Sequence, residues 1–186
     1  MPYKVEVEWS PANELVASLR AYLQSRGYGS TFELGRDWSA DVRKRGGKEL
    51  AGAVDAAGGV DSVDLLVLQS PDKETVEDSV EWLSRLSRGE VIDRLIGFYL
   101  DCDGRSADGV SSKAISEMTG IATRWDKIVN LLNVWNRVYF SAVDPRILSG
   151  LRDDADAKRT LIASTLPEDL VEEATSGVRL DPTGEE

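Results

Sequence analysis

Alternating apolar and polar residues open the chain. From Tyr3 to Trp9, apolar side chains take every second position and charged side chains take the positions between them. This period of two is typical of a β-strand with one buried face. An isolated strand leaves its edge groups unpaired, and residues 178–181 alternate in the same way near the other end. We therefore expect a small β element that pairs the two ends of the chain.

Between these ends the apolar residues recur three and four positions apart, which predicts helices. Ser10 and Pro11 form a start signal, because serine is a favoured N-cap and proline suits the first helical position. Ser70 and Pro71 repeat this signal. The glycine pairs at 46–47 and 58–59 and the single Gly89 are expected to end helices. The expected helices cover about residues 11–26, 34–46, 48–57, 62–67, 71–88, 91–100, 145–162 and 167 onward.

The longest expected helix runs from about Ser112 to Val143, after a polar loop at residues 101–110. Its apolar residues keep a near-heptad rhythm, which suits packing along another long helix. They are Met118, Ala122, Trp125, Val129, Leu132 and Tyr139. The whole pattern predicts a mainly α fold. We expect one domain over residues 1–186, an orthogonal or bundle-like set of helices with the small β element.

The composition is that of a globular chain, with 41% apolar and 30% charged residues among 186. The 33 acidic residues outnumber the 22 basic ones, and the net charge is −11. Such a surface repels nucleic-acid phosphates and anionic membranes. No apolar run approaches the roughly 20 residues of a membrane span. We therefore expect no direct nucleic-acid binding, no membrane partner and a cytoplasmic location.

Histidine is absent and Cys102 is the single cysteine. This excludes histidine-based nucleophile pairs and Cys/His metal sites from the chain. The aspartates of the loop at 101–110 do not follow the ligand spacing of a calcium loop. Ser70 and Lys73 have the spacing of some acyl enzymes but lack the companion motifs. We expect no enzyme activity, no catalytic or metal-binding residue and no cofactor.

Five tryptophans are the unusual feature of the composition. Large aromatic side chains supply core area, and they also line pockets for flat apolar ligands. Core packing is the favoured interpretation, and a pocket is the alternative. The expected lining of that pocket is Trp38, Trp82, Trp125, Trp135 and Tyr139. Its ligand would be a small apolar effector.

Several short motifs, in the same order along the chain, resemble one group of bacterial ArsR-type transcription regulators. The group begins with a strand that leads into a Ser-Pro-x-x-Glu-Leu-x-x-Ser-Leu helix, and the matching segment here is Val5-Glu6-Val7-Glu8-Trp9-Ser10-Pro11-Ala12-Asn13-Glu14-Leu15-Val16-Ala17-Ser18-Leu19. The later matches are Leu34-Gly35-x-x-Trp38, Thr75-Val76-Glu77-Asp78, Trp82-Leu83, Leu86-Ser87-x-Gly89, Trp135-Asn136-x-x-Tyr139-Phe140 and Asp144-Pro145-x-Ile147-Leu148.

The resemblance implies an N-terminal helical region of such a regulator, with its winged-helix DNA-binding domain absent here and expected C-terminal to it. It implies a role in effector sensing or dimerisation, so the expected partners are a second copy of the chain and a small apolar effector. Many ArsR-type repressors sense metals through Cys and His, which this composition does not support. The alternatives are a stand-alone helical protein-interaction module and, less favoured, an enzyme that acts through carboxylates alone.

Overall fold

The computed structural model describes residues 7, 9–25, 35–60, 62–71, 74–103 and 111–164. This part of the chain is mainly helical, as the sequence predicts, and it contains no β-strand. The expected β element falls on residues 3–9 and 178–181. Apart from Val7 and Trp9, which are not in a strand, these residues lie outside the described ranges.

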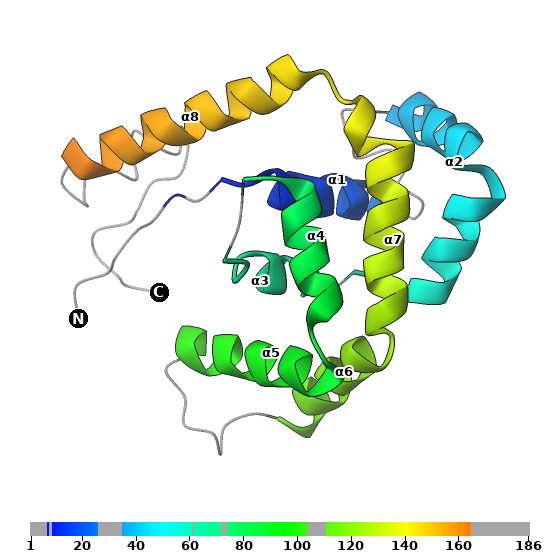
Figure 1. Ribbon diagram of the computed structural model, residues 1–186, viewed down its shortest axis with the longest axis vertical. Helices are drawn as coiled ribbons and strands as arrows, with labels where there is room; N and C mark the ends of the chain where they lie inside the picture. The colour runs from blue at the N-terminus through cyan, green and yellow to red at the C-terminus, as the bar shows by residue number, and fades with distance from the viewer. Residues whose placement is uncertain are drawn as a thin grey trace, which may run out of the picture. The chain divides into compact units, whose positions relative to one another are not determined.

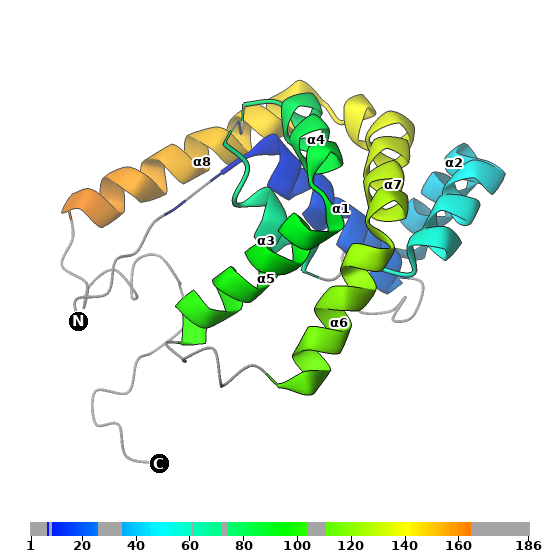
Figure 2. The same ribbon diagram turned by 60° about the horizontal axis from the view of Figure 1, so that its bottom comes forward.

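The chain divides into two compact units. The larger one is Ser10–Val143, and the smaller one combines Met1–Trp9 with Asp144–Glu186. In the larger unit α1 (Pro11–Ser25) contacts α2, α3, α4 and α7, and it crosses behind α4 in Figure 1 and Figure 2. Its start is confirmed, because the Ser10 hydroxyl accepts a hydrogen bond from the Asn13 amide at 3.1 Å.

The next helix, α2 (Gly35–Ala57), is broken at Gly47, where φ is 52° and ψ is −143°. This region of backbone space is accessible almost only to glycine. A side chain at Gly46 would also collide with Leu50, because its Cβ would lie 2.5 Å from the Leu50 Cβ. The expected helix ending at the glycine pair 46–47 is therefore confirmed, and so is the following helix that ends at Ala57.

Two short helices follow, α3 (Val63–Val67) and α4 (Val76–Arg85). The predicted helix start at Ser70–Pro71 is wrong. The helix begins one residue after Thr75, whose hydroxyl accepts a hydrogen bond from the Asp78 amide at 3.1 Å. Acidic residues in the first turn also interact favourably with the helix dipole. The helix therefore starts at the Thr75 cap and not at Ser70–Pro71.

Gly89 does not stop a helix, contrary to the sequence prediction. It lies in the first turn of α5 (Arg88–Asp103). A capping box starts this helix: the Ser87 hydroxyl accepts from the Glu90 amide at 3.3 Å, and the Glu90 carboxylate accepts from the Ser87 amide at 2.8 Å. These side-chain and backbone hydrogen bonds from Ser87 lower the pKa of the Glu90 carboxyl.

The predicted single helix from Ser112 to Val143 is also wrong. It is divided into α6 (Ser112–Thr123), α7 (Trp125–Val138) and the 3-10 turn η2 (Phe140–Ala142). The division falls at Arg124, where φ is −102° and ψ is 11°. It lets α6 pack on α5, while α7 packs on α1, α2 and α4 (Figure 2). The core of the larger unit therefore surrounds α7, whose buried residues are Trp125, Ile128, Val129, Leu131, Leu132, Val134 and Trp135.

The smaller unit contains α8 (Pro145–Ser164), which begins at the expected proline. The Arg152 guanidinium lies over the Trp9 ring, 4.9 Å from its centroid. Arg159 Nε donates to the Val7 carbonyl at 2.8 Å. Val7 and Trp9 are thus held against α8 by two arginines.

Across both units, none of the helices in the described ranges combines the length and the apolar character that a bilayer crossing requires.

Gly47→Ala is expected to lower the free energy of unfolding by about 1–3 kcal/mol, because alanine at this φ and ψ is strained. Gly52→Ala is the matched control. Gly52 is helical in the same α2, with no atom within 4 Å of a built Cβ, so alanine should stabilise by roughly 0.5–1 kcal/mol. Urea denaturation followed by circular dichroism measures both changes. Equal effects of the two substitutions would contradict the break at Gly47.

Candidate functional site

Three of the five aromatic residues proposed from the sequence come together, and Tyr22 joins them. The ring centroid of Trp135 lies 5.0 Å from the ring centroid of Tyr22 and 4.8 Å from that of Tyr139. Trp38 meets Tyr22 and Tyr139 edge-on, at 6.1 and 5.5 Å. These four rings, the aromatic cluster, link α1, α2 and α7 in a closed cycle.

Two members of the aromatic cluster belong to the core, and the other two, Trp38 and Tyr139, are half-buried. Trp135 is fully buried and Tyr22 is 3% exposed. The Trp135 indole donates a hydrogen bond to the Ser18 hydroxyl at 3.0 Å, which satisfies the polar atom of the most buried ring. The two edge-on contacts of Trp38 have a geometry that aromatic pairs prefer. We therefore assign the cluster to core packing.

The other two proposed residues lie elsewhere. Trp125 begins α7, and its indole donates to the Leu83 carbonyl at 2.9 Å near the end of α4. Trp82 lies on α4, beneath the Arg94 guanidinium of α5 at 5.0 Å from the ring centroid. Each ring therefore connects two helices on its own. The ring contacts therefore connect only three of the five residues to one another.

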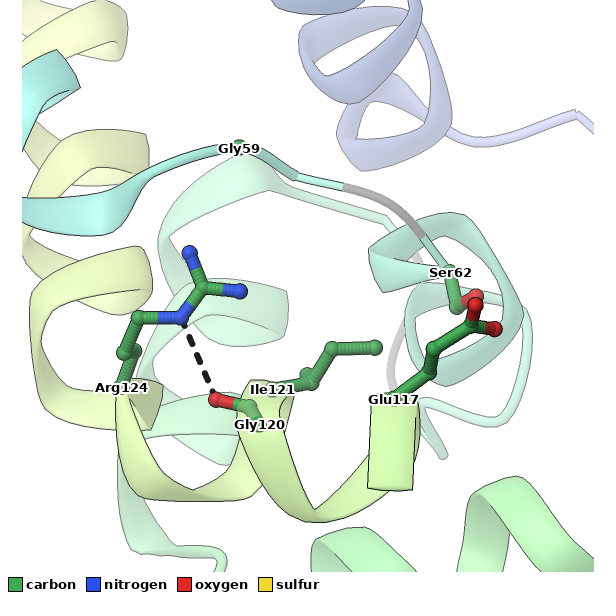
Figure 3. A pocket seen from close by; sticks show the side chains of 6 residues that line it. All are labelled: Gly59, Ser62, Glu117, Gly120, Ile121 and Arg124. Carbon is green, nitrogen blue, oxygen red and sulfur yellow. Dashed lines mark hydrogen bonds between the residues drawn. The ribbon is translucent and has the colours of Figure 1, made fainter. Parts of the chain in front are cut away.

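A cavity of about 440 Å³ lies in the larger unit, between the loop after α2 and one face of α6 (Figure 3). Its volume is within the roughly 300–1,000 Å³ of small-molecule sites. The residues that line it are Gly59, Ser62, Glu117, Gly120, Ile121 and Arg124.

The loop beside this cavity has an unusual backbone. Gly58 and Gly59 have φ values of 67° and 133°, and Ser62 has a φ of 60°. Ser62 is the one non-glycine residue with positive φ in the part of the chain that the structure describes. A serine in the left-handed region costs of order 1 kcal/mol, and such strain clusters at functional sites.

Arg124 closes one end of the cavity. Its Nη1 donates to the Ala57 carbonyl at 2.5 Å, and its Nε donates to the Gly120 carbonyl at 3.2 Å. The Ala57 carbonyl is at the end of α2, where a helix lacks internal partners and favours a cation. A Cβ on Gly58 would lie 2.2 Å from Arg124 Nη1. The glycine therefore makes room for the guanidinium.

The guanidinium retains unused donors. A guanidinium has five N–H groups, and its bonds to other described residues use two of them. Figure 3 shows the guanidinium beneath the loop at Gly59. Arg124 can therefore hold a ligand anion while it keeps its bonds to the protein.

Glu117 and Ser62 lie at the other end of the cavity, with Ile121 between them and Arg124 (Figure 3). The Glu117 carboxylate is paired with Lys113 at 3.9 Å, and both side chains are mostly exposed. Such an exposed pair contributes little, so the carboxylate is available to a ligand. Ile121 is buried and supplies an apolar surface.

Sequence reasoning missed this cavity. The sequence pattern predicts only a helix end at the glycines 58–59, and it places Arg124 inside one continuous helix. The isolated arginine between the apolar positions Ala122 and Trp125 was the available signal. Within the described ranges, no group of three or more Asp, Glu, Cys or His side chains is placed to hold a metal ion.

Comparisons of the chain with protein-family models, with curated proteins and with solved structures found no match.

Ser18→Ala is expected to destabilise the larger unit by about 1–3 kcal/mol, because it leaves the buried Trp135 indole without its acceptor. Ser84→Ala is the matched control, since Ser84 also bonds a helix carbonyl but is exposed on α4. Its effect should stay within about 0.5 kcal/mol. Urea unfolding monitored by tryptophan fluorescence compares them. A silent Ser18→Ala would contradict the assignment of the cluster to the core.

Proposed function

We propose that this chain is the effector-binding region of a bacterial transcription regulator of the ArsR type, and that its effector binds in the cavity beside Arg124. The observation that carries the proposal is the position of Arg124, which bonds the end of α2 and α6 at the boundary with α7. The family role is supported by the ordered motifs that resemble this group. The cavity replaces the aromatic cluster as the expected effector site.

The proposed mechanism is a shift between two arrangements of the helices. A ligand anion on Arg124 would change how firmly the end of α2 is held to α6. Because α7 begins at the next residue and packs on α1, α2 and α4, the change would extend through the core. An effector acts in this way only if it binds one arrangement more tightly.

DNA would be bound by another part of the regulator. The net charge of −11 opposes contact between this region and phosphates. In the resembling group a C-terminal winged helix makes that contact, and the proposal places the protein in the cytoplasm. The β element expected between the chain ends remains part of the proposal.

A thermal-shift screen of small metabolites tests the effector role. We expect a ligand that raises the melting temperature and whose affinity falls at least about ten-fold in Arg124→Gln, because a charged hydrogen bond is lost. Arg43→Gln is the control, since Arg43 is exposed on α2 and does not line the cavity. The proposal fails if no metabolite binds, or if every ligand found binds Arg124→Gln as tightly as the unsubstituted protein.

A role as an interaction module is the second candidate, and exposed apolar residues favour it. Ile147 and Leu151 are 57% and 37% exposed and lie one turn apart on α8. In the larger unit, Tyr99 and Ile115 are 46% and 45% exposed. A second copy of the chain that covered the α8 pair would account for the dimerisation expected from the sequence.

Sedimentation equilibrium tests this second candidate. Dimerisation through α8 predicts a concentration-dependent dimer, and Ile147→Glu is expected to raise the dimer dissociation constant at least about ten-fold, because it places a charge in an apolar contact. Ser149→Glu is the control on the same helix, at another exposed position. A chain that stays monomeric at high concentration, or two substitutions with equal effects, would exclude α8 as the dimer interface.

A further inference from the structure

The two ends of the cavity carry opposite charges. Arg124 and Glu117 are seven residues apart, so two helical turns place them on one face of α6 and its C-terminal boundary. A separation of seven residues corresponds to about 10.5 Å along the axis. Ile121 lies between the two charged groups and faces the same space (Figure 3). From one end of the cavity to the other, the lining is therefore first positive, then apolar and then negative.

Each part of this lining selects a different part of a ligand. The planar guanidinium of Arg124 matches a carboxylate, which can accept two parallel hydrogen bonds. The Glu117 carboxylate and the Ser62 hydroxyl together accept hydrogen bonds from an ammonium group. The buried Ile121 favours methylene groups between the two charges.

We infer that the cavity binds a linear zwitterion, with a carboxylate at one end, an ammonium at the other and an unbranched apolar chain between them. This is the chemistry of an ω-amino acid, and the inference rests on the effector role proposed above. An α-amino acid fits poorly, because its two charges are on groups attached to one carbon and cannot reach both ends. A ligand with a single charge would form an ion pair with only one of Glu117 and Arg124.

This ligand class departs from the small apolar effector expected from the sequence. That expectation follows from the tryptophans, but the rings of the aromatic cluster contact one another at centroid distances of 4.8 to 6.1 Å. The cavity, in contrast, is lined by two charged side chains, Arg124 and Glu117. We therefore expect the ligand to be recognised by its charges at both ends and not by contact with aromatic rings.

Isothermal titration with three probes of one chain length tests the inference: 6-aminohexanoate, hexanoate and hexylamine. We expect 6-aminohexanoate to bind at least about ten-fold more tightly than either singly charged probe. Glu117→Gln should remove most of this advantage and leave the affinity for hexanoate unchanged. Arg124→Gln should weaken both carboxylates. Asp93→Asn, at an exposed position on α5, is the matched control and should change none of the affinities.

Two results would overturn the inference. If hexanoate binds as tightly as 6-aminohexanoate and Glu117→Gln has no effect, the site selects a simple anion. If none of the three probes binds, the zwitterion class is wrong. In both cases the effector role survives if the metabolite screen still returns a ligand that depends on Arg124. A screen without any such ligand removes the proposed function itself.

Discussion

Arg124 is the residue at which three helices of the larger unit meet. Its guanidinium bonds the last residue of α2 and a carbonyl of α6, and its backbone separates α6 from α7. The carbonyls at the end of α2 have no partners within the helix, so the cation satisfies one of them where the helix dipole is negative. The close approach requires Gly58, whose positive φ and missing side chain leave room for the guanidinium. Arg124 therefore joins α2 to α6 and at the same time lines the cavity.

The rest of the larger unit follows from the division of the helices at Arg124. A continuous helix over residues 112–138 would have to pack on α5 with its first half and on α1, α2 and α4 with its second half, although both halves would share one axis. Because the helix is divided, α6 and α7 can have different axis directions, and each packs on its own neighbours. It buries both Trp125 and Trp135, and each indole finds a hydrogen-bond acceptor. The cavity therefore adjoins a densely packed helix, which is the rigid support that a binding site needs.

Local signals in the sequence predicted the features that depend on nearby residues. The Ser10–Pro11 start, the ends at the glycine pairs and the apolar faces of most helices are of this kind. The failures at Pro71, Gly89 and Arg124 have a common cause: each depends on a competing interaction that a periodic pattern does not show. Thr75 and Ser87 cap the helices that begin after them. Arg124 donates a hydrogen bond to a carbonyl that is 67 residues away in the sequence.

The candidate site was harder to predict than the fold for the same reason. The residue types in the sequence point to the tryptophans as candidates. Which of them contact one another depends on which helices pack together, and the sequence does not predict that Tyr22 is among the contacts. Glu117 and Arg124 line one cavity only because the fold brings Gly59 and Ser62, from the loop between α2 and α3, to the same space.

The nuclear magnetic resonance spectrum of the arginine side chains tests this account most directly. It predicts one Nε–H signal, lost in Arg124→Lys, that exchanges slowly with solvent and belongs to a guanidinium with restricted rotation. Exposed arginines such as Arg43 should rotate freely. If the Arg124 signal is averaged like theirs, the arginine does not hold α2 to α6, and neither the cavity nor the coupling between helices follows.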